Sequence, residues 1–103
     1  MTARFLAMYE TPTDIDAFER HYQEVHVPLA KRLPGLRSYT ISRGIHAVRG
    51  DTTYYMVAML DWDDLEALRA AFASRVGQET AADVANLTAL APTVSMTFEV
   101  VEV

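Results

Sequence analysis

Residues 18–36 read FERHYQEVHVPLAKRLPGL, and the rest of the chain can be placed around this stretch. Apolar residues within it and just before it recur three or four positions apart, which is the spacing of one face of an α-helix. These residues are Ile15, Phe18, Tyr22, Val25, Leu29 and Leu33. Pro34 and Gly35 follow at once and end the helix. The sequence therefore predicts a long amphipathic helix that packs one face on another layer.

Two residues inside this helix are unusual. His26 falls within the apolar arc, whereas His21 lies on the opposite flank when each residue is turned by about 100°. Pro28 cannot donate a backbone hydrogen bond to the carbonyl of Glu24 and crowds it, so we expect a kink there. An imidazole beside such a kink can act as an acid–base group, because it titrates near neutral pH. A hydrogen-bonded core histidine is the other interpretation, and both remain open at this point.

Four β-strands are predicted around this helix. Residues 4–10 and 53–61 are apolar at nearly every position, which indicates strands that are covered on both faces. Residues 36–43 mix polar and apolar side chains, and residues 94–103 begin with a clear alternation. The first pair of strands is therefore expected at the centre of a sheet, and the second pair at its edges.

Two further helices are predicted before the last strand. Asp63 can cap the first of them and Gly77 stops it, while residues 80–91 form the second. The element order is then β-α-β-β-α-α-β, which is the pattern of the α+β ferredoxin-like fold with a four-stranded antiparallel sheet. A single domain over residues 1–103 accounts for the whole sequence.

The strand pattern also predicts a homodimer. In this fold the helices lie on one face of the sheet, so the central strands should be polar on the other face if it met water. Here they are apolar on both faces, and no segment remains to cover the second one. We therefore expect two copies of the chain to pack sheet against sheet.

Composition excludes several partners and chemistries. Half of the 103 residues are hydrophobic, and the net charge of -5 disfavours nucleic acid and anionic membranes as partners. The longest apolar run, residues 54–60, is too short to span a bilayer. The chain has no cysteine, which excludes disulfides and thiol catalysis. Because the N-terminal residues also lack a signal-peptide pattern, we expect a cytoplasmic protein.

Aromatic side chains supply a candidate pocket between the helix and the sheet. Tyr22 lies four residues before His26 on one helix face, so a hydroxyl and an imidazole can form its polar end. Tyr39, Trp62 and Phe72 are further candidates for its wall or its mouth. Core packing is the alternative for each of these aromatics. The pocket would suit a small hydrophobic or aromatic ligand.

No metal or cofactor motif stands out. His21 and His26 would point about 140° apart on a regular helix, and His46 lies in a predicted loop. The serines lack the strand–turn–helix nucleophile motif, and the glycines are too scattered for a phosphate loop. We therefore expect neither a metal site nor a bound cofactor.

Three segments carry a resemblance to a known family. They are FxxHYxxxHxPL at residues 18–29, LPGLRxY at residues 33–39, and ADVAN at residues 82–86. With them the chain resembles the EthD family, which lies within the dimeric α+β barrel superfamily. It departs from the family at residues 73–77, ASRVG, where a Ser-Pro-Glu-Gly-like turn is frequent.

The resemblance implies a dimeric barrel, and it leaves the activity open. Related proteins of the superfamily include cofactor-free lactone isomerases, small quinone-forming monooxygenases and haem-degrading enzymes. In the isomerase-like relatives the pocket lies between the first helix and the sheet, where His26 would face it. The haem-degrading relatives carry a ligating histidine on the second helix, and no histidine follows His46 here.

Two functional hypotheses follow. The first is a cofactor-independent enzyme, isomerase or oxygenase-like, that acts on a small cyclic or aromatic catabolic intermediate with His26 as its acid–base group. The second is a non-catalytic ligand-binding or accessory protein of a catabolic pathway.

Overall fold

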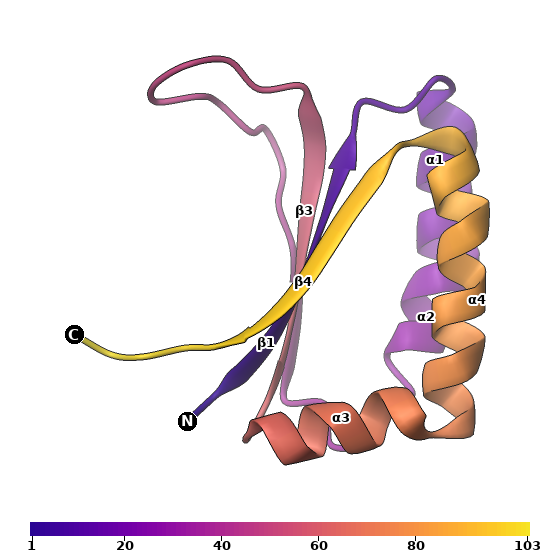
Figure 1. The fold of residues 1–103 in the computed structure, drawn as a ribbon. Coiled ribbons are helices and arrows are strands. Elements are labelled where there is room, and N and C mark those ends of the chain that lie inside the picture. Colours follow the sequence, from indigo (N-terminus) through magenta and orange to yellow (C-terminus); the bar gives the residue numbers. More distant parts are fainter.

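Four antiparallel strands form one sheet, with all helices on the same side of it (Figure 1). The computed structural model describes residues 1–103, and the strand order is β2-β3-β1-β4. The strands are β1 (Ala3–Glu10), β2 (Ser38–Ile41), β3 (Tyr54–Trp62) and β4 (Thr93–Glu99). The two strands predicted to be central, β1 and β3, occupy the centre, and the fold is ferredoxin-like as predicted.

The first predicted helix is divided into three segments. These are α1 (Ile15–His21), the π-helix η1 (Tyr22–His26) and α2 (Val27–Ala30). The N–H of Val27 donates to the carbonyl of Tyr22, five residues back, as in a π-helix. Pro28 follows directly, and its ring and missing N–H are incompatible with a regular α-helical turn over Glu24. The irregularity expected at this proline therefore takes the form of a π-helical turn.

Helix boundaries after β3 differ from the prediction. The helices are α3 (Leu65–Ala73) and α4 (Arg75–Leu90), so Gly77 lies in the first turn of α4 and stops neither helix. The break lies at Ser74, whose hydroxyl accepts the N–H of Gly77 at 3.1 Å and caps α4. A Cβ at Gly77 would collide with the carbonyl of Ala71, so glycine is needed there for close packing.

Aspartates cap the N-termini of two helices. Asp14 caps α1 by accepting the N–H of Ala17 at 3.0 Å. Asp64, one residue after the expected Asp63, caps α3 by accepting the N–H of Ala67 at 2.8 Å. None of the helices is long and apolar enough to cross a membrane.

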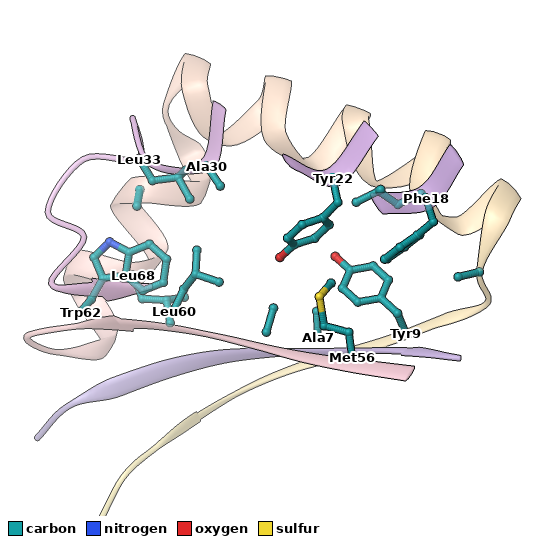
Figure 2. Packing of buried hydrophobic residues seen from close by; sticks show 14 of the residues in the cluster. Ala7, Tyr9, Phe18, Tyr22, Ala30, Leu33, Met56, Leu60, Trp62 and Leu68 are labelled. Atoms are coloured by element: carbon teal, nitrogen blue, oxygen red, sulfur yellow. The ribbon is translucent and has the colours of Figure 1, made fainter. Parts of the chain in front are cut away.

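The core lies between the sheet and the helices (Figure 2). Successive side chains of β1 and β3 alternate between the two faces of the sheet, and the set facing the helices is buried. This set includes Ala3, Ala7, Tyr9, Met56, Ala58, Leu60 and Trp62. Phe18 of α1 packs edge-on against Tyr9, with ring centroids 5.4 Å apart. This contact joins the first helix to the centre of the sheet.

The other face of the sheet is apolar and has no helix over it (Figure 1). Leu6, Met8, Val57 and Met59 of the central strands lie on this face and are only partly buried. On β4, Val94, Met96 and Phe98 share the face and remain 38–46% exposed. We call this surface the open sheet face. One bidentate ion pair interrupts it, in which Arg4 contacts Asp61 at 2.7 and 3.0 Å.

Candidate active site

A cavity of about 260 Å³ lies between the sheet and the helices. We call α1, η1 and α2 together the first helical region. The cavity wall is formed by all four strands, this first helical region, α3 and α4. Most of the wall is hydrophobic, and its polar side chains are Tyr9, Tyr22, His26, Tyr39, Thr80, Thr93 and Ser95. An apolar cleft with a few converging polar groups is the usual form of a small-molecule site.

His26 joins this cavity to a buried carboxylate. Its Nδ1 lies 2.9 Å from Oδ2 of Asp83, which α4 carries, and only 6% of His26 is exposed. His21 places its Nε2 2.8 Å from the other oxygen of Asp83, Oδ1. Asn86 donates its side-chain N–H to the same Oδ1 at 2.9 Å. One carboxylate thus holds two histidines from the first helical region against α4.

The π-helical turn explains how both histidines reach Asp83. On a regular α-helix His21 and His26, five residues apart, would point in different directions. In η1 the N–H of Val27 bonds to the carbonyl five residues before it, and this wider turn brings residues five apart onto the same side of the helix. The expectation of opposite flanks is therefore wrong, because it assumed the wrong helical period.

Protonation at the site follows from burial and hydrogen bonding. Burial alone would raise the pKa of Asp83, but the hydrogen bonds from Asn86, His26 and His21 outweigh it and lower that pKa. Asp83 is therefore ionised at neutral pH and can only accept hydrogen bonds. Burial lowers the pKa of His26 by more than the neighbouring Asp83 raises it. His26 is thus neutral, with its proton on Nδ1 facing Asp83.

The second ring nitrogen of His26 is free to act on a ligand. Nε2 has no hydrogen-bond partner in the protein, and every side-chain nitrogen or oxygen that is fully enclosed has one. Nε2 must therefore reach open space, and His26 is part of the cavity wall. With the proton on Nδ1, this nitrogen carries a lone pair and can accept a proton.

Two tyrosine hydroxyls meet at the cavity beside this histidine. The hydroxyl oxygens of Tyr22 and Tyr39 lie 2.7 Å apart, and the rings of Tyr22 and His26 are 5.3 Å apart. Burial raises the pKa of both tyrosines, so both stay protonated at neutral pH. One hydroxyl donates to the other, which leaves one O–H of the pair available to a ligand oxygen.

Comparison with known proteins establishes the family. The profile described as EthD domain matches residues 10–91. The chain belongs to the EthD family. An uncharacterised 11.0 kDa protein from the thcB-thcC intergenic region of Rhodococcus erythropolis is 34% identical over 83 residues, which is 81% of either chain. An EthD family protein from Bacillus halodurans has a similar crystal structure, with a TM-score of 0.87 and 29% identity over 98% of this chain and 100% of that one.

More distant structures share the fold. SnoaB from Streptomyces nogalater, a cofactor-independent oxygenase, has a TM-score of 0.69 at 22% identity, covering 99% of this chain and 95% of that one. A dimeric ferredoxin-like protein of unknown function from Thermobifida fusca has a TM-score of 0.69 at 20% identity, covering 97% and 92%. At these identities the likeness concerns the fold alone.

The structure brings most of the predicted site residues of this EthD protein together. His26, Tyr22, Tyr39 and Phe72 all line the cavity. Trp62 does not: it is fully buried, and its indole N–H donates to the carbonyl of Pro34 at 2.9 Å. The expectation that Trp62 stands at a cavity mouth is therefore wrong, because that bond turns its polar atom toward the loop after α2.

Asp83, the residue that organises the site, is not among the site residues predicted from the sequence. Asp83 falls within the ADVAN segment of the EthD resemblance, yet its partners lie 57 and 62 residues earlier. One local signal was present, since Thr80, Asp83 and Leu87 form a single buried stripe of α4 and two of them are polar. No group of three or more His, Cys, Asp or Glu side chains is arranged to hold a metal ion.

Proposed function

We propose that this EthD protein is a cofactor-independent enzyme that removes a proton from a small cyclic or aromatic molecule, with His26 as the general base. The observation that carries the proposal is the position of the His26 ring. One nitrogen is fixed on the ionised Asp83, while the other has no partner in the protein and belongs to a ring that lines a largely apolar cavity. A carboxylate that orients an imidazole and leaves its other nitrogen toward the ligand is a common arrangement for acid–base catalysis.

Charge balance supports this role. When Nε2 takes a proton from a carbon or an oxygen of the ligand, His26 becomes positively charged, and the adjacent Asp83 carboxylate stabilises that charge. The electron pair left on the ligand moves toward an oxygen and forms an enolate or a phenolate. The free O–H of the Tyr22–Tyr39 pair is available to donate to that oxygen.

Two fates of the resulting anion define two reaction types. Return of the proton to a different carbon gives an isomerase. Bonding of dioxygen, as co-reactant, to the carbanion carbon gives a peroxide that takes the proton back from His26, and loss of water from this hydroperoxide leaves a new carbonyl group. This is an oxygenase reaction, the activity named for the structurally similar SnoaB. Both start with the same proton transfer, which is the step that this site supports.

We also propose that the protein acts as a homodimer joined through the open sheet face. Val94, Met96 and Phe98 are too exposed for an apolar strand surface that meets only water. The structurally similar protein from Thermobifida fusca is described as dimeric. Pairing of two such faces would not cover the cavity, which lies on the opposite side of each sheet.

Hydrogen–deuterium exchange tests the base directly. The protein is incubated in D₂O with a panel of cyclic ketones, phenols and lactones, and loss of ligand protons is followed by NMR. We expect His26→Ala to slow exchange by about 100-fold or more, as for loss of a general base. His46→Ala, which alters an exposed loop histidine, is the matched control. Equal exchange rates in wild type and His26→Ala would refute the proposal.

The ligand-binding alternative gives a different result in the same experiment. A hydrophobic cavity wall also suits a protein that binds its ligand without converting it. In that case ring compounds would shift the NMR signals of cavity residues, and no compound would exchange faster than in buffer. Dioxygen uptake, measured on any compound that does exchange, distinguishes an oxygenase from an isomerase.

A further inference from the structure

Tyr9 carries a buried hydroxyl that the protein itself does not use. Its side chain lies on the helix-facing side of β1, is 2% exposed and lines the cavity. The hydroxyl makes no hydrogen bond within the chain, although every fully enclosed polar side-chain atom has a partner. The oxygen of Tyr9 therefore faces the open space of the cavity. Figure 2 shows the hydroxyls of Tyr9 and Tyr22 directed into the same space between sheet and helix.

The ring of Tyr9 is held firmly in this direction. It packs edge-on against Phe18 and Tyr22, with centroid separations of 5.4 and 5.8 Å. The strand pairing shifts directly after Tyr9, which pairs with Met56 while Glu10 pairs with Tyr54. Such bulges often redirect side chains beside functional sites. A fixed ring leaves only the rotation of the O–H to adapt to a ligand.

A phenol at this position needs an explanation. A phenylalanine would fill the same space without placing a polar group in an apolar layer, which has a free-energy cost unless the group is hydrogen-bonded. Burial raises the pKa of Tyr9, so its hydroxyl remains a donor throughout the physiological range. A ligand oxygen that accepts this hydrogen bond would remove the cost.

We propose that Tyr9 binds an oxygen atom of the ligand, and that this ligand is a one- or two-ring compound bearing a carbonyl group. This deepens the proposed function and rests on it for the identity of the site. The Tyr22–Tyr39 pair has one O–H to offer, because the other is used within the pair. Tyr9 supplies a second donor, and a carbonyl oxygen has two lone pairs to accept both.

The size of the cavity agrees with this class of ligand. An apolar cavity of about 150 Å³ is enough for benzene, and the cavity here is about 260 Å³. A compound of one ring or of two fused rings, with a carbonyl group, therefore fits the cavity. The carbonyl would lie at the three tyrosines and make the adjacent C–H acidic enough for His26 to remove.

Binding of a matched pair of compounds tests the role of Tyr9. The probes are 1-indanone, a bicyclic ketone, and indane, the hydrocarbon of the same shape, titrated into wild type and Tyr9→Phe by NMR. We expect wild type to prefer 1-indanone, and Tyr9→Phe to bind the ketone about fivefold more weakly, as for one lost neutral hydrogen bond. Binding of indane should change less than twofold. Tyr54→Phe alters a tyrosine outside the cavity and is the control.

Stability provides a second measurement on the same variant. Because the Tyr9 hydroxyl has no partner in the protein, Tyr9→Phe should unfold at the wild-type temperature or above it. A lower unfolding temperature would contradict the inference, since it would reveal an internal partner for the hydroxyl. Equal loss of affinity for ketone and hydrocarbon would also overturn it, because that result reports packing. So would a wild type that does not bind 1-indanone.

The two proposals can fail separately. Tyr9-dependent binding of 1-indanone, with no compound of the panel exchanging protons faster than in buffer, would refute the catalytic proposal and retain the role of Tyr9. Exchange that depends on His26, together with unchanged ketone binding in Tyr9→Phe, would refute the role of Tyr9 alone.

Discussion

Replacing Asp83 by asparagine probes the whole site, because this carboxylate holds both histidines. The substitution keeps the shape of the side chain and removes its charge. Hydrogen bonds to a charged group contribute about 1.5–3 kcal/mol each, and an amide offers only one acceptor atom in place of two. We expect Asp83→Asn to lower the free energy of unfolding at pH 7 by about 2–4 kcal/mol. For a chain of this length, Tm should fall by roughly 10–25 °C.

The pH dependence of stability gives a sharper signal. Burial lowers the pKa of His26, so the unfolded chain takes up this proton before the folded one does. The contribution of His26 is therefore complete above its unfolded pKa of about 6.5 and is lost as pH falls toward the lowered folded pKa. The pKa of Asp83 is also lowered, since its hydrogen bonds outweigh the effect of burial. Its contribution is present above its unfolded pKa of about 3.9 and is lost at more acidic pH.

Asp83→Asn should change the loss of stability in both pH ranges, the one set by His26 and the one set by Asp83. The carboxylate opposes the fall in the pKa of His26, so its removal should lower that pKa further and steepen the loss of stability between about pH 6.5 and 5. The loss of stability below about pH 3.9, which protonation of Asp83 causes in wild type, should disappear. Urea unfolding followed by circular dichroism at several pH values measures both. Asp51→Asn, in an exposed loop, is the control. A variant as stable as wild type, with the same pH dependence, would refute this account of the site.

Three further substitutions test separate parts of the structure. Gly77→Ala should destabilise the protein by about 1–3 kcal/mol in urea unfolding, since the added methyl meets backbone of α3. Tyr22→Phe should lower stability by about 1 kcal/mol because Tyr39 loses its partner, and an unchanged Tm would contradict that hydrogen bond. Met96→Lys, on the open sheet face, should halve the mass measured by ultracentrifugation, whereas the similarly exposed Val25→Lys on the helical side should not. A wild-type mass of one chain would exclude the dimer.

Strand order was predictable because the position of a strand in a sheet determines how many polar residues it carries. Central strands carry few polar residues, and residues 4–10 and 53–61 are apolar at nearly every position, which placed them at the centre of the sheet. The pairing of β1 with β3 and β4 then follows from the small set of connections that the element order permits. Local pattern and topology pointed to the same fold, and the structure confirms it.

The parts that could not be predicted depend on contacts distant in sequence or on a change of helical period. Pro28 signals that a regular helix fails, but a kink and a π-helical turn use the same residue. The partner of the Trp62 indole is a backbone carbonyl, and a sequence gives no sign of which one. Asp83 has the same difficulty, because one sequence carries no information on its pairing with residues of another helix.

Two irregular helix positions together create the site. The cap at Ser74 and the tight contact at Gly77 fix where α4 begins, and therefore which residues of α4 face the first helical region. A shift of one residue would turn Asp83 away by about 100°. On the opposite side, the π-helical turn sets the direction of His26. Each irregularity gives up regular helical bonding, and each places one member of the pair that the proposed chemistry needs. From sequence alone, His26 could be a hydrogen-bonded core residue or a catalytic one. In the structure Asp83 satisfies one of its ring nitrogens, and the proposed function assigns the other ring nitrogen to the ligand.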